Sequence, residues 1–184
     1  MHLMVLDRCD HKCKLCCNKL YDIEKIPVAT VEELKQVHTV CITGGEPFMA
    51  GINIDGLAEN IKKQYENVKN IYVYTSGSAL RAYLAARVFP PFFYVDGLNI
   101  APKNGLDWEE LRWIYEYAPI QCLDSINNLK SNRLYVFKEQ KEIFENRYSF
   151  LPKLHNLNVI YRKWDKEFKT PDNEIFRRLP IFLG

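Results

Sequence analysis

The sequence predicts an α/β fold, built as a single domain with a partial (β/α)6 barrel and a mostly parallel sheet. Three observations favour it. Short β-rich runs alternate with helical patterns, six such units occur, and the chain of 184 residues is shorter than the about 250 that a complete eight-unit barrel typically needs. A doubly wound sheet gives the same alternation and remains the alternative.

The expected elements follow from hydrophobic periodicity and from helix-start signals. Thr30 with Glu33 predicts a capping box, and Asp107 with Glu110 predicts a similar helix start. The strands are expected at 2–6, 38–43, 70–75, 93–100, 133–137 and 157–161, and the helices at 31–36, 55–67, 78–88, 107–117 and 138–147.

Composition excludes several classes of protein. The chain is 47% hydrophobic and 26% charged, which is typical of a globular domain. A net charge of +2 gives no indication of nucleic-acid binding or of attraction to an anionic membrane. No stretch of about 18 apolar residues predicts a membrane span, and the first residues lack a signal-peptide core. We therefore expect a cytoplasmic protein.

Four of the six cysteines lie between positions 9 and 17. Cys9, Cys13 and Cys16 have the spacing C-x3-C-x2-C, and three thiolates on a short loop can converge on one metal centre. Sulfur ligands favour iron–sulfur clusters, zinc or copper(I). A 4Fe–4S cluster with only three protein ligands keeps one iron open to another molecule. We favour this cluster over a structural zinc site, in which Cys17 would be a fourth ligand.

A second motif, Thr43-Gly44-Gly45-Glu46-Pro47, directly follows the β-rich run 38–42. Paired glycines allow a sharp turn and a close approach of a ligand to the backbone. Glu46 adds an acceptor suited to an ammonium group, and Pro47 fixes the exit from the turn. Taken alone, the motif is more typical of a plain strand-to-helix turn.

Together, the two motifs and their order resemble the radical S-adenosylmethionine (radical SAM) superfamily. The resemblance implies that Cys9, Cys13 and Cys16 bind a 4Fe–4S cluster whose fourth iron is chelated by SAM. It also implies that the turn at 44–47, Gly44, Gly45, Glu46 and Pro47, binds the methionine amino group. One position departs from the family pattern, because Leu15 stands where an aromatic residue is common.

Two further residues are candidates for binding SAM. In a parallel barrel all loops after strands open on one face, so the two motifs and the ends of the next strands are expected side by side. The resemblance assigns Ser76 to a polar turn that contacts SAM and Asn99 to the ribose, with helix capping by Ser76 or Ser78 as the alternative. Lys103 is interpreted as a solvated loop residue, with contact to an anionic substrate as the alternative, and Cys41 and Cys122 are interpreted as core residues.

The activity that the resemblance implies is reductive cleavage of SAM to a 5′-deoxyadenosyl radical, which abstracts hydrogen from a substrate. The electron donor would be a flavodoxin or a ferredoxin. The substrate would be a small molecule, as in 7-carboxy-7-deazaguanine synthases, or a protein, as for glycyl-radical activases such as the activator of anaerobic ribonucleotide reductase. A non-catalytic zinc-binding or interaction module is the alternative of another class. Residues 162–184, which follow a core at about 1–161, are expected to form a lid over a small-molecule site.

Overall fold

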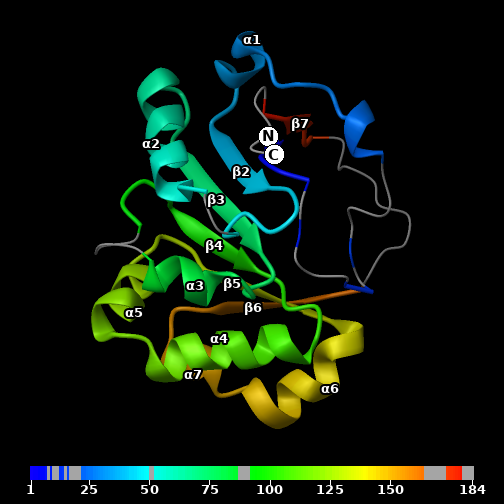
Figure 1. Cartoon of the computed structure of the whole chain (residues 1–184), viewed down its shortest axis with the longest axis vertical. Coiled ribbons are helices and arrows are strands. Elements are labelled where there is room, and N and C mark those ends of the chain that lie inside the picture. Colours follow the sequence, from blue (N-terminus) through cyan, green and yellow to red (C-terminus); the bar gives the residue numbers. More distant parts are fainter. Residues whose placement is uncertain are drawn as a thin grey trace.

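The computed structural model describes residues 1–7, 9, 13–14, 16, 22–49, 52–86, 92–163 and 173–179. Within them, the chain forms an α/β fold around one sheet of seven parallel strands (Figure 1). The strands are β1 (His2–Met4), β2 (Thr39–Thr43), β3 (Asn70–Thr75), β4 (Gly97–Ile100), β5 (Arg133–Phe137), β6 (Asn158–Arg162) and β7 (Phe176–Arg178).

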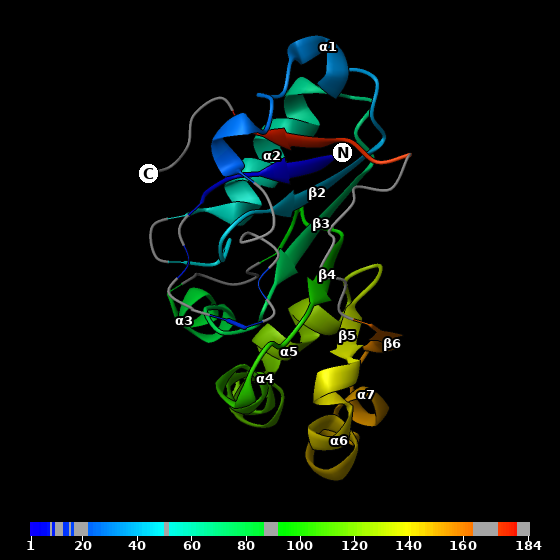
Figure 2. The same cartoon turned by 90° about the vertical axis from the view of Figure 1, so that its right-hand side faces the viewer.

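The strand order is β6-β5-β4-β3-β2-β1-β7. Figure 2 shows the strands fanning from β7 and β1 at one end of the sheet to β6 at the other. Strands β1 to β6 therefore lie in chain order, without the reversal that a doubly wound sheet has at its switch point. The α/β class and the parallel sheet are confirmed, and the order is consistent with a partial barrel.

Strand β7 was not predicted. It adds to the outer side of β1, with His2 opposite Phe176 and Met4 opposite Arg178. Its other side is also paired, because the Arg178 N–H donates to the Pro27 carbonyl and the Ala29 N–H donates to the Arg178 carbonyl, both at 2.9 Å. Part of the segment expected to be a lid is thus a strand of the sheet. Residues 164–172 and 180–184 of that segment lie outside the described residues.

The helices follow the predicted alternation, with differences at their ends. The capping box of Thr30 and Glu33 is confirmed. The helix expected at 107–117 instead begins after Asn104, whose side chain accepts from the Leu106 and Asp107 N–H groups. The longer helices are α2 (Ile54–Gln64), α3 (Leu80–Ala85), α4 (Gly105–Tyr117) and α5 (Ile120–Asn127); the shorter ones are η2 (Ile23–Lys25), α1 (Val31–Leu34), η3 (Lys138–Gln140), α6 (Lys141–Ile143), η4 (Phe144–Tyr148) and α7 (Leu151–Leu154).

Three helices were not predicted, one of them the 3₁₀ turn η2. Helix α5 was missed because Pro119 precedes it and its eight residues carry a short apolar pattern. Helix α7 is a single turn with Pro152 near its start. The helix expected at 138–147 is divided into a 3₁₀ turn, an α turn and a π-helical turn.

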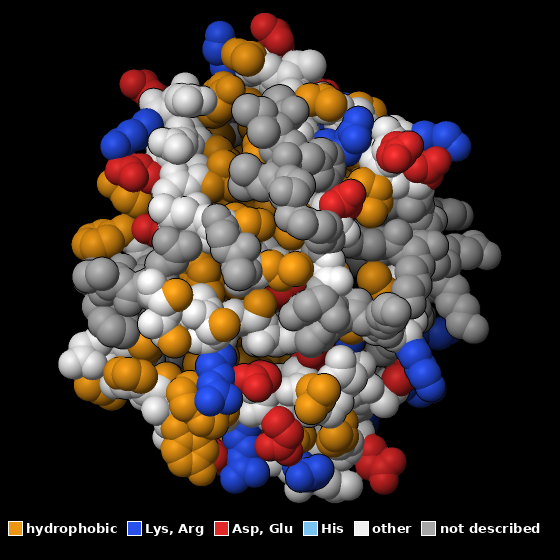
Figure 3. All heavy atoms as spheres, in the orientation of Figure 1, with side chains coloured by type: hydrophobic (Ala, Val, Ile, Leu, Met, Phe, Trp, Pro, Cys, Tyr) orange, Lys and Arg blue, Asp and Glu red, His pale blue; other side chains and the backbone are white. Residues whose placement is uncertain are grey.

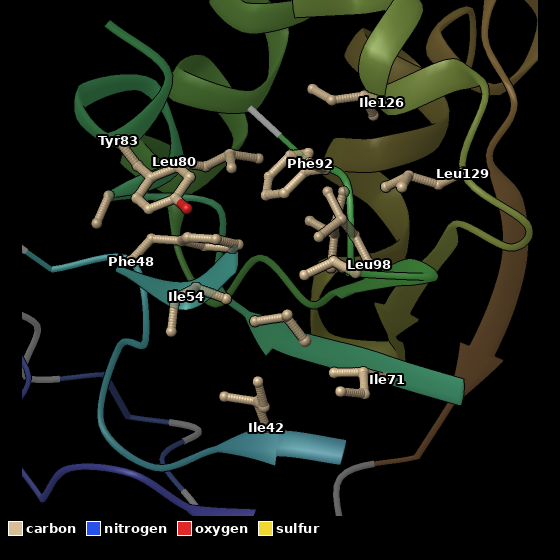
Figure 4. Packing of buried hydrophobic residues seen from close by; sticks show 14 of the residues in the cluster. Ile42, Phe48, Ile54, Ile71, Leu80, Tyr83, Phe92, Leu98, Ile126 and Leu129 are labelled. Atoms are coloured by element: carbon tan, nitrogen blue, oxygen red, sulfur yellow. The ribbon is translucent and has the colours of Figure 1, made fainter. Parts of the chain in front are cut away.

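The two faces of the sheet have different characters. On the face toward the helices, alternate strand residues are fully buried in the hydrophobic core, as β-strand geometry requires. Figure 4 shows Ile42, Ile71 and Leu98 of this face packing near residues from the helices and loops. The positions in between lie on the opposite face, here called the inner face. They are half-buried in β3, as at Tyr72 and Tyr74, and mostly buried in β4 and β5.

No helix among the described residues is both long and apolar enough to span a bilayer. Acidic and basic side chains are intermixed around the face that Figure 3 displays, in line with the small net charge. The described residues of this face therefore present no broad basic surface of the kind that binds nucleic acid.

Candidate functional site

The loops that follow β1, β2, β3 and β4 meet around one pocket at the carboxyl end of the sheet. Its volume is about 120 Å³. In Figure 1 the arrowheads of β2, β3 and β4 point toward the same side, which brings these loops together. The pocket is lined by Cys9, Cys13, Cys16, Thr43, Gly44, Gly45, Glu46, Tyr74, Thr75, Ser76, Ala101 and Lys103.

Most of the predicted site residues therefore lie at one place. The three cysteines, both glycines of the turn, Glu46 and Ser76 all line this pocket. Pro47 is buried beside it, and Asn99 lies on β4 below the pocket; neither is among the lining residues. Leu15 and Cys17 lie outside the described residues.

The first glycine of the turn is required by a close approach of two loops. Gly44 has φ of +135°, which side chains rarely tolerate, and a Cβ at this position would lie 2.3 Å from the Leu6 carbonyl oxygen. The Gly45 N–H donates to that same oxygen at 2.9 Å. The glycines thus hold the turn against the chain that leads into the cysteine motif. We expected them to make room for a ligand, but at Gly44 the immediate neighbour is backbone.

Glu46 joins the loop after β2 to the loop after β3. Its side chain is 1% exposed. One carboxylate oxygen accepts from the Thr75 hydroxyl at 2.6 Å, and the other accepts from the Ser76 N–H at 2.9 Å and the Ser76 hydroxyl at 2.8 Å. The Phe48 N–H lies 3.4 Å from the first oxygen. Thr75 was not among the predicted site residues, and its position at the end of β3 is the signal that could have identified it.

The electrostatics of Glu46 favour a bound cation. Burial raises the pKa of Glu46, although the hydrogen bonds from Thr75 and Ser76 partly oppose this shift. A buried carboxylate gains most when a positive charge comes within a few ångströms. Glu46 therefore has the character expected of an ammonium acceptor.

Ser76 contacts Glu46 and does not cap a helix. Helix α3 begins after Ala79, whose side chain has no polar atom. The Ser76 hydroxyl instead donates to Glu46 and lies 2.9 Å from the Ser78 hydroxyl. Helix capping by Ser76 or Ser78 is therefore wrong as an interpretation. Ser76 has its hydroxyl at the pocket, where it is also available to a ligand.

Two of the three motif cysteines, Cys13 and Cys16, are half-buried, and Cys9 is exposed. Burial raises the pKa of the Cys13 thiol, and the negative charges of Asp107 and Cys16 raise it further. The positive charge of Lys103 and a hydrogen bond with Asn104 act in the opposite direction. A thiolate at Cys13 therefore needs more positive charge than the surrounding side chains supply, as a metal centre would provide.

The donor set fits a cluster in kind. Three thiols line one pocket, and thiolates are the ligands that iron–sulfur clusters use. Within the described residues, however, no three His, Cys, Asp or Glu side chains are arranged to hold a single metal ion. The indications of a cluster site are therefore the spacing of the three cysteines and their shared pocket. The described residues do not show a preformed coordination geometry.

Asn99 lies one level deeper, on the inner face of β4. It is 1% exposed, and its side-chain oxygen accepts from the Tyr135 hydroxyl at 3.5 Å. The amide nitrogen is buried and has no hydrogen-bond partner in the described part of the chain. Such an atom usually binds water or a ligand group. Its predicted contact with a ribose remains a prediction.

Lys103 departs from its interpretation as a solvated loop residue. It is half-buried, it lines the pocket with the cysteines, and its ammonium lies 3.8 Å above the Phe137 ring. The Lys103 N–H donates to the Asp107 carboxylate at 2.7 Å, which fixes the backbone where the loop enters α4. The pocket therefore has a cation on the side that β4 and β5 form.

The two isolated cysteines have different surroundings. Cys122 is buried in the core, as predicted. Cys41 is half-buried on β2, at an inner-face position, and burial raises its pKa to about 11. Neither lines the pocket. Burial favours the protonated form of both thiols, and both lie away from the pocket. Metal ligands, by contrast, are deprotonated thiolates.

Comparison of the sequence with models of known protein families found no match, and comparison with curated proteins found none either.

The Gly44 geometry predicts a strong sensitivity to substitution. Gly44→Ala should lower the free energy of unfolding by roughly 2 kcal/mol or more, because alanine is strained at this φ and its methyl group meets the Leu6 carbonyl. Gly105→Ala is the matched control, since no atom lies within 4 Å of its added methyl group. Urea unfolding measures both variants. Equal stabilities would contradict the close approach of the two loops.

Glu46 predicts a pH dependence of stability. Its pKa is raised in the folded state above the unfolded value of about 4.3, so the unfolded carboxyl ionises first as the pH rises. Stability should therefore fall as the pH rises from the unfolded to the folded pKa. Urea unfolding of the metal-free protein between about pH 4 and 7 should show this loss, and Glu46→Gln should remove it. A wild-type protein that instead loses stability relative to Glu46→Gln as the pH falls would indicate a lowered pKa.

Proposed function

We propose that the chain is a radical SAM enzyme that binds a 4Fe–4S cluster through Cys9, Cys13 and Cys16 and SAM beside it. The observation that carries this proposal is the meeting of the C-x3-C-x2-C motif and the Gly44-Gly45-Glu46 turn at one pocket. The two motifs lie on different loops, and a site that combines them needs both. The parallel topology supplies the reason for their meeting, since loops after successive strands are neighbours.

The proposed division of roles follows the chemistry of the residues. The three thiolates would hold the cluster and leave one iron for SAM. When bound, the cluster and SAM would supply the radical chemistry that removes hydrogen from a substrate. Glu46 binds the SAM ammonium, for which its buried carboxylate is suited.

The chain's own residues orient the cofactor in this proposal. Thr75 and Ser76 hold the Glu46 carboxylate through their hydroxyl groups, and Ser76 adds its N–H. Gly44 keeps the turn close to Leu6 and so close to the start of the cysteine motif. A shift of either loop would separate the ammonium site from the thiolates, and catalysis is sensitive to displacements of about 1 Å.

The first test is the metal content. Protein purified without oxygen should contain about four irons and equivalent acid-labile sulfide per chain. Replacing Cys9, Cys13 or Cys16 with Ala should abolish the iron, because each is a ligand in the proposal.

Cys41→Ala is the matched control, because Cys41 lies on β2 and does not line the pocket. Cys17→Ala should also retain most of the iron. Stoichiometric zinc without sulfide would contradict the proposal and would favour the zinc-binding module.

The second test is SAM chemistry. With a strong reductant, the iron-loaded protein should form 5′-deoxyadenosine from SAM, slowly even without a substrate. Glu46→Gln should weaken SAM binding about tenfold, because it removes the charge that pairs with the ammonium while keeping the volume. Its iron content should be near that of the wild type. A folded Glu46→Gln protein that has lost its iron would contradict the division of roles.

A further inference from the structure

The inner face of the sheet is unusually polar for a parallel barrel. Such interiors are commonly filled by layers of Val, Ile and Leu. Here the positions on this face include Thr39, Cys41 and Thr43 of β2 and Tyr72 and Tyr74 of β3, all half-buried. A polar, partly exposed surface beside the candidate site is suited to binding a ligand.

Aromatic rings on this face run toward β6. The Tyr74 and Tyr135 rings are nearly parallel, with centroids 6.3 Å apart and an interplanar angle of 7°. On the other side, the His2 ring lies 5.5 Å from Tyr74. The Arg162 guanidinium lies 4.2 Å from the centroid of the Tyr135 ring. The Tyr135 ring is buried and is covered by the Arg162 cation, whereas Tyr74 is half-buried.

Arg162 is exposed although it stands on this inner face. It is the last residue of β6 and pairs in register with Phe137, over which the Lys103 ammonium lies at 3.8 Å. Lys103 lies over the Phe137 ring and Arg162 over the Tyr135 ring, two residues away on the same face of β5. The two cations are here called the cationic flank. The flank lies at the carboxyl end of the sheet, and Lys103 also lines the cysteine pocket.

The charge of Arg162 is not balanced by a nearby carboxylate. In the described part of the chain, Arg162 forms no ion pair. Glu174, at the start of β7, accepts instead from the His2 ring at 2.8 Å. A guanidinium that stacks on a ring keeps its N–H groups free to bind a planar anion.

We infer that the substrate is a small organic anion, carrying a carboxylate or phosphate group that the cationic flank of Arg162 and Lys103 binds. This inference rests on the proposed function, which supplies a reaction at the adjacent pocket. The half-buried Tyr74 would contact the uncharged part of the molecule. The anionic group would lie against β5 and β6, and the rest of the molecule would extend toward the cysteine pocket.

The test compares two probes of the same shape, benzoate and its neutral counterpart benzamide, by NMR titration of the metal-free protein. Benzoate should bind about tenfold more tightly, because only the carboxylate forms charge-assisted bonds with the flank. Arg162→Gln should remove most of this preference. Arg147→Gln is the matched control, since Arg147 pairs with Glu109 on the outer surface and should leave the preference unchanged.

Three outcomes would overturn the inference. Equal binding of the two probes would show that the flank does not select anions. A benzoate preference that survives Arg162→Gln would show that benzoate binds at another site. A preference that is lost equally in Arg147→Gln would show that it depends on net charge. Displacement of benzoate by S-adenosylhomocysteine would assign the flank to the carboxylate of the cofactor. None of these results requires iron, so they are distinguishable from failure of the SAM cleavage test.

Discussion

The Glu46 carboxylate is the contact on which the geometry of the site depends. It is buried, and its oxygens take hydrogen bonds from Thr75 and Ser76 on the neighbouring loop. Because an unpaired buried carboxylate is costly, the two loops are held at the separation that satisfies it. On its other side, the same turn is pressed against Leu6 at Gly44. Three loops are therefore fixed relative to one another by one charged side chain and one glycine.

This arrangement connects stability with binding. Burial of the Glu46 carboxylate costs the protein stability, and a bound ammonium group would offset this cost. Cys13 is similar in kind, since burial and nearby negative charge disfavour its thiolate. The pocket thus gathers acidic groups whose charged forms its own residues stabilise only in part, and positively charged ligands would stabilise those forms. Sites of this kind are common where function takes precedence over stability.

Sequence patterns predicted the features that depend on local chemistry. The six predicted strands follow from alternating apolar residues, and the capping box of Thr30 and Glu33 needs only residues three apart. The turn at Gly44 is local as well, because few residues other than glycine adopt its φ. The spacing of the three motif cysteines can likewise be read directly from the sequence. From these features, the parallel topology led to the expectation of one shared site.

The tertiary structure decided what depends on residues far apart in the chain. Strand β7 has only three residues, and it forms because β1 and the segment around Pro27 pair with its two sides. The bonds between Glu46 and Thr75, and the position of Lys103 over Phe137, have no sequence signal, because each needs two strands to come together first. A helix turn or a tight turn orders only a few neighbouring residues, so its cost in conformational entropy is small and local propensity can determine it. The long-range contacts form only after the sheet has brought distant segments together.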